Sequence, residues 1–393
     1  MRKKRLLTLT AVFFLAALVL PAASAFAARQ PGITILVDLT HNQPATGIDI
    51  MMKMLPEAHW YLLVPSEEVK SSLPKATLAL ADEVIVGSLV DVKDRIGMFD
   101  VIIIGQPCKE FSPDEIQVIK DWFYSGADQR KVLWVAGDSD YPAQGGNLEI
   151  AQHAIDEILE AVGSCLREDF VSVEDYSSNA GKPYRVVGLV EPDPGAEIVG
   201  FAAHKVLFHG PGVVAYVDEN GNWKSLTDSK PANVYRIVWT TNNSAIVEHQ
   251  PKAPGAPGET GRAYSAGQTG KFVLLAAEVM NVSIEGKNTT RVVIVSGESP
   301  YGDYQPGVTY MYHGVKLDGP RFFRNLLLWS TGYMGELQDV QDLMNENKKL
   351  SEKVSELEKK VATGAGGKSI AVAGIVVAII AIIMAALALA KKK

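Results

Sequence analysis

A run of 22 residues without a charged side chain, at positions 369–390, most limits what this chain can become. A helix of that length is about 33 Å long at ~1.5 Å per residue, which suffices to cross the ~30 Å hydrocarbon core of a membrane. Three lysines follow at 391–393, and positive residues stay on the cytoplasmic side. We therefore expect a transmembrane helix at 369–390, a cytoplasmic tail at 391–393 and the upstream chain outside the cell. A buried core helix is the alternative.

A heptad repeat precedes this run. Its a and d positions are aliphatic except for one asparagine: Val340, Leu343, Asn347, Leu350, Val354, Leu357 and Val361. Valine at a with leucine at d favours two parallel strands, and a single asparagine at a fixes their register. We expect a coiled-coil stalk at 336–361 that joins two copies of the chain, followed by a glycine-rich hinge at 363–368. A solvated single helix is the alternative.

The N-terminus has the parts of a secretory signal peptide. Residues 2–5 are basic, residues 6–20 are apolar, and small residues follow up to Ala27. We expect a signal peptide at 1–27, with an uncleaved first membrane helix as the alternative. The whole chain has a net charge of −7 although both terminal segments are positive, so the part between them is strongly acidic. That charge argues against nucleic acid as a partner.

If the chain is exported, its cysteines could form a disulfide and its sequon asparagines could carry glycans. Cys108 and Cys165 could form one disulfide in an oxidising exterior, or they could be two separate buried thiols, and the sequence does not decide between these alternatives. Asn242, Asn281 and Asn288 each begin an N-x-[ST] sequon. On an exported chain such sequons are expected glycosylation sites.

The residues between the termini, 30–334, alternate strand and helix patterns in their first half. Apolar runs predict strands at 33–39, 60–64, 83–86, 101–105 and 131–136, and periodicity predicts helices at 47–55, 112–124 and 148–162. This alternation indicates an α/β domain with a parallel sheet and helices on both faces. From about 168 to 280, short runs between Gly, Pro and Asn turns predict a β-rich excursion. A strand at 291–296 and a helix at 319–331 then return to the sheet.

Polar residues follow several of the predicted strands. The carboxyl ends of parallel strands share one edge of a sheet, where open α/β sheets bind ligands. The candidates for a ligand-binding cleft at this edge are Asp38, Thr40, His41, Asn42, Gln106, Asp138, Ser139, Asp140, Glu298 and Ser299. We expect some of these tips to line one cleft. For any single residue, an ordinary role in a turn or a helix cap is the alternative.

The tips also carry a resemblance to a known superfamily. Its marks are Asp38-x-x-His41-x-Gln43, Gly137-Asp138-Ser139, and Gly297-Glu298-Ser299 followed by Phe323-x-x-Leu326-Leu327-x-Trp329. Over about 33–332 the chain resembles the class I glutamine amidotransferase-like superfamily. It is more similar to a non-enzymatic branch of exported or membrane-linked proteins of unknown function, related to a domain of gliding and intraflagellar-transport proteins. The resemblance implies a flavodoxin-like fold.

The same resemblance puts enzyme activity in doubt. The enzymes of the superfamily present a cysteine on a tight strand-to-helix turn, with His and Glu as partners. The equivalent turn here is 137–140, which has no cysteine. Ser139 could replace it only with a base in reach, and His41 oriented by Asp38 is the candidate.

Metal binding is a second hypothesis for these tips. Asp138, Asp140 and Glu298, with Asp38 and Asp303, offer the oxygen ligands that divalent cations prefer. No cofactor is expected.

The sequence thus predicts a membrane-anchored extracellular binding or structural module of the cell envelope. One form of it is an accessory subunit of a transporter or of a surface complex. The alternative is a surface hydrolase or amidase-like enzyme that uses the cleft at the strand tips.

Overall fold

The computed structural model of the chain describes residues 32–140, 149–248, 260–302, 306–334 and 337–363. The chain divides into two compact units, Met1–Tyr333 and Met334–Lys393. The expected signal peptide, membrane helix and cytoplasmic tail lie outside the described residues, as does the hinge beyond Thr363. Within the described ranges, no helix is both long enough and apolar enough to cross a membrane.

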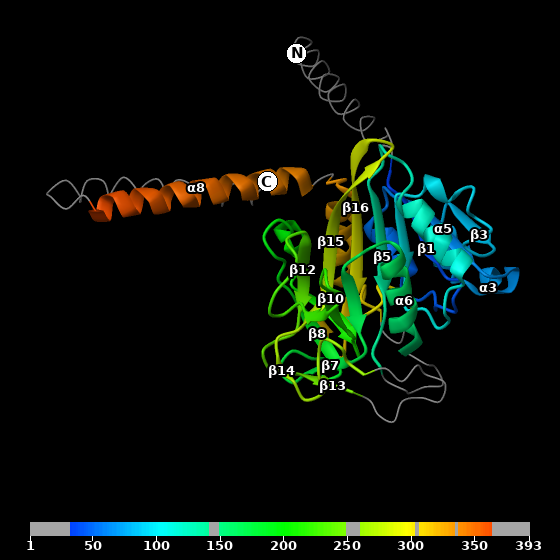
Figure 1. Cartoon of the computed structure of the whole chain (residues 1–393), viewed down its shortest axis with the longest axis horizontal. Helices are drawn as coiled ribbons and strands as arrows, with labels where there is room; N and C mark the ends of the chain where they lie inside the picture. Colours follow the sequence, from blue (N-terminus) through cyan, green and yellow to red (C-terminus); the bar gives the residue numbers. More distant parts are fainter. Residues whose placement is uncertain (1–31, 141–148, 249–259, 303–305, 335–336, 364–393) are drawn as a thin grey trace, which may run out of the picture. The chain divides into compact units, whose positions relative to one another are not determined.

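The first unit is built on a ten-stranded sheet (Figure 1). In spatial order its strands are β3 (Glu83–Val86), β2 (His59–Val64), β1 (Thr34–Asp38), β4 (Val101–Ile104), β5 (Lys131–Ala136), β16 (Lys287–Ser296), β15 (Val273–Ile284), β12 (Val234–Trp239), β8 (Arg185–Val190) and β9 (Lys205–His209). The strands from β3 to β16 are parallel to one another. From β16 to β9 each strand is antiparallel to its neighbour.

The core of this sheet is flavodoxin-like. Counted along the chain, β1, β2, β4, β5 and β16 stand in the spatial order 2-1-3-4-5, which is the flavodoxin order. The short strand β3 is added outside β2. The expected parallel sheet is present from β3 to β16, but the sheet as a whole is mixed, because four strands from the excursion region continue it beyond β16. Of these, β15 pairs with the edge of β16, which would otherwise present unpaired backbone groups.

The rest of the excursion forms small antiparallel sheets. One contains β11 (Trp223–Ser225), β10 (Val213–Val217) and β6 (Leu166–Asp169), and another contains β14 (Thr269–Gly270), β13 (Ser244–Val247) and β7 (Ser172–Asp175). A hairpin of β17 (Met311–Tyr312) and β18 (Val315–Lys316) follows β16. Short runs between turns therefore became β structure, as the sequence pattern predicted.

Helices cover both faces of the sheet. They are α2 (Ile48–Met54), α3 (Glu67–Ser72), α4 (Lys75–Leu80), α5 (Pro113–Phe123), α6 (Glu149–Ala161) and α7 (Gly319–Thr331), with 3-10 turns at Ile96–Met98 and Glu197–Gly200. Helix α5 begins at a capping box: the Ser112 hydroxyl accepts from the Glu115 amide, and the Glu115 carboxylate accepts from the Ser112 amide. This start was predicted, because serine, proline and acidic residues favour a helix N-terminus.

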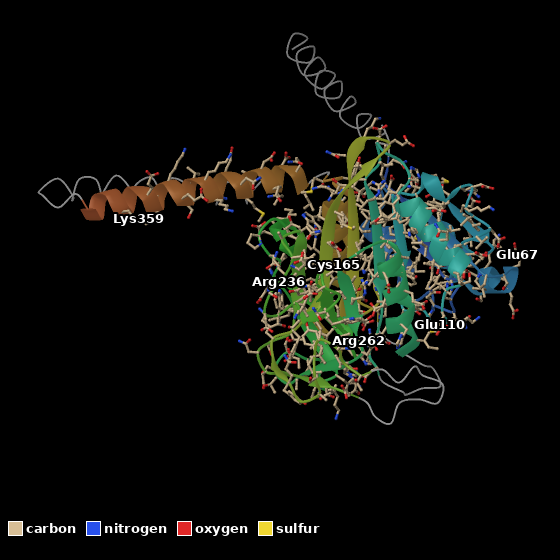
Figure 2. The ribbon with its side chains drawn as sticks, in the orientation of Figure 1. Glu67, Glu110, Cys165, Arg236, Arg262 and Lys359 are labelled. Carbon is tan, nitrogen blue, oxygen red and sulfur yellow. The ribbon has the colours of Figure 1, made fainter. Side chains whose placement is uncertain are left out.

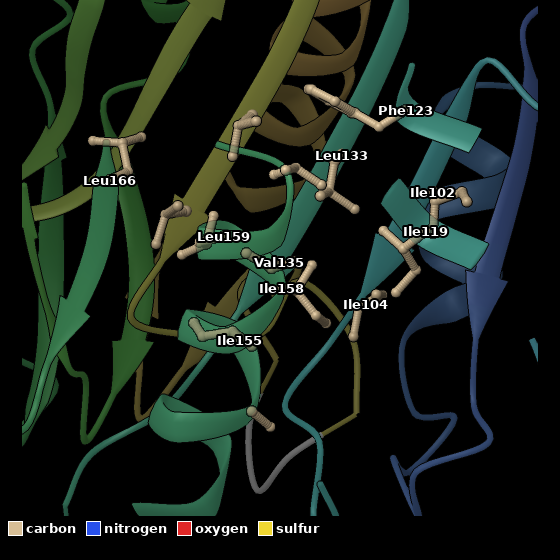
Figure 3. Packing of buried hydrophobic residues seen from close by; sticks show 14 of the residues in the cluster. Ile102, Ile104, Ile119, Phe123, Leu133, Val135, Ile155, Ile158, Leu159 and Leu166 are labelled. Atoms are coloured by element: carbon tan, nitrogen blue, oxygen red, sulfur yellow. The ribbon is translucent and has the colours of Figure 1, made fainter. Parts of the chain in front are cut away.

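Strand β5 contributes to both hydrophobic layers. Leu133 belongs to the main core, together with Ile119 of α5 and Ile155 of α6 (Figure 3). Trp134 points to the other face, where its ring stacks on Phe323 of α7 at 5.3 Å between centroids. A fully buried side chain of this kind stabilises the fold by about 1.5–3 kcal/mol. All six residues of β5 are buried, which explains why its sequence shows no alternation.

The second unit contains one described helix, α8 (Leu337–Thr363). It spans the predicted stalk, so the helical part of that prediction is confirmed. In the single chain the predicted contact positions Leu343 and Leu350 are 52% and 39% exposed. The pairing of two copies through this stripe stays a prediction.

Candidate functional site

The candidate site is the carboxyl edge of the parallel strands. β1 and β4 are neighbours there, while the chain continues from β1 toward β2 on one side and from β4 toward β5 on the other. Such a switch point is the usual ligand crevice of open α/β sheets. Here Tyr301, from the loop after β16, occupies it: its hydroxyl donates to the Asp38 carbonyl at 2.5 Å and accepts from the Gly105 amide at 2.8 Å.

Tyr301 is held tightly in this place. It is 1% exposed, and burial raises the pKa of its phenol well above the ordinary value, so the hydroxyl stays a neutral donor. A Cβ atom on Gly105 would lie 2.5 Å from Ser299 Oγ and 2.8 Å from the Tyr301 ring. A glycine is therefore required at the end of β4 for the tyrosine to approach.

The tip after β1 forms a compact network around Asp38. Its Oδ1 accepts from Thr40 Oγ1 at 2.6 Å, and its Oδ2 accepts from Gln43 Nε2 at 3.1 Å. His41 Nδ1 lies 3.2 Å from Asp38 Oδ2, and Gln43 Oε1 accepts from the His41 amide at 2.7 Å. The spacing Asp38-x-x-His41-x-Gln43 thus reflects a hydrogen-bonded turn in which the side chains bind one another.

Helix α5 covers the other side of His41. The imidazole ring stacks on Phe111 at 3.6 Å between centroids, and its Nε2 lies 3.6 Å from Glu115 Oε2. The Asp38–His41 half of the hydrolase hypothesis is therefore present. Both ring nitrogens, however, already lie next to carboxylates.

The tips after β4 and β5 are tied to each other. Gln106 Nε2 donates to Asp138 Oδ2, and Asp138 Oδ1 accepts from the Ser139 amide at 2.6 Å. Gln152 of α6 donates to the Asp138 carbonyl at 2.9 Å. The turn after β5 thus holds an aspartate that bonds to its neighbours.

Two further acidic candidates bond to nearby loops. Asp140 and Ser172 are joined through the Asp140 amide and carboxylate. Glu298 accepts from the His209 amide at 2.6 Å and from the Ser299 amide at 2.9 Å. These bonds connect the tips of the parallel core to the excursion. Among the described residues, no group of three acidic, His or Cys side chains is arranged to hold a metal ion, and Asp303 lies outside them.

The structure brings most of the predicted cleft residues together, but into a packed network. The buried ones are Asp38, His41, Gln106, Asp138, Ser139, Asp140, Glu298 and Ser299. Thr40 is half-buried and Asn42 is exposed. A separate hollow of about 420 Å³ lies between α5 and α6, lined in part by Glu110 (Figure 2), Phe111, Lys120 and Glu157.

Sequence reasoning missed Glu168 of β6, which lies under these tips. A Cβ atom on Gly137 would be 1.4 Å from Glu168 Oε2, and one on Gly212 would be 1.8 Å from Oε1. Glu168 is fully buried, and neither carboxylate oxygen has a hydrogen-bond partner in the part of the chain that the structure describes. Burial, and then the neighbouring Asp156 and Asp138, raise its pKa well above the ordinary value.

The cysteines and sequons lie away from the tips or at their margin. The structure has two thiols rather than a disulfide: Cys108 is exposed, and Cys165 (Figure 2) is partly buried. Burial raises the pKa of the Cys165 thiol, which disfavours its reactive thiolate form. The asparagines of all three sequons, Asn242, Asn281 and Asn288, are exposed.

No family model and no curated protein matches the chain. A solved structure titled "mmIFT52 N-terminal domain" is similar at a TM-score of 0.38 and 10% sequence identity, over 76% of this chain and 97% of that chain. The likeness is one of a mixed α/β sheet and assigns no family.

Proposed function

We propose that the chain is a membrane-anchored extracellular binding or structural module of the cell envelope, without catalytic activity. One observation carries the proposal: the sheet edge where this class of fold places its chemistry is filled by the chain's own side chains. Tyr301 occupies the switch point between β1 and β4. A module whose switch point is filled by its own side chains would act through its surface.

The hydrogen bonds at the edge make it costly to open. Leaving one buried donor or acceptor unpaired costs about 1–3 kcal/mol. Withdrawing Tyr301 would strand the Gly105 amide, and separating Gln106 from Asp138 would remove one hydrogen bond from a buried carboxylate. A substrate would have to replace several such bonds before any reaction at this edge.

The C-terminal end of the first unit supports the proposal that this unit is anchored through the chain that follows it. Helix α7 ends at Thr331 and is capped by Gly332, where an added Cβ atom would lie 3.2 Å from Arg130, the residue before β5. The chain therefore leaves this unit at the amino edge of the parallel strands, opposite the tips. In the proposed arrangement the apolar stripe of α8 joins two copies.

The location is tested by labelling Cys108 from outside. This thiol is exposed, whereas Cys165 is partly buried with a raised pKa. In intact cells that express the full chain, a membrane-impermeant maleimide should label the wild type, and Cys108→Ser should lose the label. Labelling that appears only after the cells are permeabilised would contradict an extracellular head.

A surface hydrolase is the second candidate, and the Asp38–His41 pair favours it. In that hypothesis Ser139 is the nucleophile. Purified full chain would be offered a panel of ester and amide substrates beside Ser139→Ala and His41→Ala. Our proposal expects no turnover that either substitution removes. A hydrolysis that both substitutions abolish, in variants that remain folded, would favour the hydrolase instead.

A further inference from the structure

The hairpin of β15 and β16 carries two of the three sequons on one face. Asn281 of β15 pairs with Thr290 of β16, and Ser283 pairs with Asn288. Directly opposed residues of antiparallel strands point to the same side of the sheet. Both acceptor asparagines and both sequon hydroxyls therefore share one face, with the asparagines as diagonal neighbours about 7–8 Å apart.

That face points to solvent. Asn281, Ser283 and Asn288 are exposed, and Thr290 is half-buried. The opposite face of the hairpin packs on the domain. There Met280 contacts the main core, Ile284 is buried, and Thr289 Oγ1 donates to the Gln129 carbonyl at 3.1 Å. The sequon face is thus the more accessible of the two, although Lys287 at the tip of the opposite face is exposed as well.

The third sequon is built differently. Its asparagine, Asn242, is exposed, but its hydroxyl belongs to Ser244, which is 1% exposed and donates to the Thr241 carbonyl at 2.8 Å. Ser244 also pairs with Asp175 and Gly270 in a three-stranded sheet. A transferase that reads the sequon hydroxyl cannot reach it in the folded chain.

The hairpin can also open locally. Its β15 strand pairs with β12 only as far as Glu278, and its β16 strand pairs with β5 only from Arg291. The turn at Glu285 and Gly286, with φ of 51° and 77°, closes a ladder that is two-stranded in the described residues. Such ladders are marginally stable, so the tip can fray and present a sequon.

We propose that Asn281 and Asn288 are the N-glycan acceptors of the folded chain and that Asn242 is not. The proposal rests on the extracellular location proposed above. In the transfer, the asparagine Nδ2 forms a bond to the anomeric carbon of a lipid-phosphate-linked oligosaccharide. The bond from that carbon to the phosphate oxygen breaks, the lipid phosphate leaves with the electron pair, and Nδ2 loses one proton to the transferase. A glycan at Asn281 also shields the outer edge of β15, whose unpaired backbone groups would otherwise invite another strand.

The acceptor test uses the purified full chain in detergent. It is incubated with an oligosaccharyltransferase and a lipid-linked oligosaccharide, and proteolytic peptides are measured by mass spectrometry. We expect glycopeptides that contain Asn281 and Asn288. Asn281→Gln and Asn288→Gln should each lose their own glycopeptide, the double variant should lose both, and Asn242→Gln should change nothing. Unfolding midpoints equal to that of the wild type show that these exposed substitutions leave the fold intact.

A denatured sample is the matched control. Once the chain is unfolded, Asn242 should be modified as well, because only the fold hides Ser244. A folded chain modified at neither Asn281 nor Asn288, or modified equally at Asn242, would overturn the proposal.

A cellular experiment separates this proposal from the location. In a host with N-glycosylation, a chain labelled at Cys108 from outside but unmodified at both hairpin sites refutes the glycan proposal alone. A chain with neither label nor glycan refutes the location, and the result with purified protein still decides whether the two asparagines are acceptors.

Discussion

Glu168→Gln tests whether the buried carboxyl under the strand tips is neutral in the folded protein. The folded-state pKa of Glu168 is raised, first by burial and then by Asp156, Asp138 and Asp169. A carboxyl with a raised folded pKa stabilises fully below its unfolded pKa and loses that contribution as the pH rises toward the folded pKa. Stability should therefore fall with pH from about 4.5 upward.

The size of the expected effect follows from how steeply the free energy of unfolding changes with pH. In the window between the two pKa values, one such carboxyl lowers the free energy of unfolding by about 1.4 kcal/mol per pH unit. Glutamine has nearly the same shape and cannot ionise, so Glu168→Gln should remove a slope of that size. The neutral amide also avoids both the cost of burying a charge at this position and the repulsion from Asp156 and Asp138. At neutral pH we therefore expect the variant to be at least as stable as the wild type.

The assay is urea unfolding of the full chain in detergent, followed by tryptophan fluorescence between pH 5 and 8. Asp156→Asn should remove a similar part of the slope, because burial also raises the pKa of Asp156 well above its ordinary value. Glu219→Gln, an exposed carboxyl in the turn after β10, is the matched control and should leave the slope unchanged. The reasoning is refuted if Glu168→Gln and the wild type lose stability with pH at the same rate.

Three further predictions concern other parts of the chain. Tyr301→Phe leaves the buried Gly105 amide without its hydrogen-bond acceptor and should lower the free energy of unfolding in urea by about 1–3 kcal/mol. An unchanged unfolding midpoint would contradict the proposal that Tyr301 fills the switch point. Burial and then Arg291 lower the pKa of Lys131 to about 8, so the free energy of unfolding should rise by about 1.4 kcal/mol per pH unit above pH 8. Lys131→Met should remove that rise, and a pH profile that this substitution leaves unaltered would argue against a deprotonated Lys131. Leu350→Asp places a charge in the apolar stripe of α8 and should convert a crosslinked dimer to monomer; equal crosslinking of both proteins would rule out the stalk as the dimer contact.

Several elements followed from local sequence alone. β5 at Lys131–Ala136 and α7 at Gly319–Thr331 have the bounds that were predicted. The signal for β5 is an uninterrupted apolar run, and the signal for α7 is an amphipathic period with a glycine just past its end. Each signal is contained within its own segment. β16, by contrast, begins at Lys287 rather than at 291. Its first residues are polar and become a strand only because β15 pairs with them.

The site divides in the same way. The turn of Asp38, His41 and Gln43 could be anticipated from spacing, because its partners lie within six positions of one another. The role of Tyr301 could not, since its hydroxyl bonds to backbone groups 263 and 196 positions away. The buried position of Glu168 could not be predicted from the sequence either. Gly137 and Gly212 were visible in the sequence, but only the fold shows that each of them makes room for the Glu168 carboxyl.

By itself, then, the sequence determined which segments form helices or strands, through the periodicity of their apolar residues. It also led to the expectation of an exported, anchored chain with a heptad stalk. These properties depend on neighbours a few residues apart. The tertiary structure alone decided whether the strand tips form an open cleft or a closed network. That outcome depends on which distant side chains reach one sheet edge, and on close backbone approaches at Gly105, Gly137 and Gly212 that local patterns do not encode.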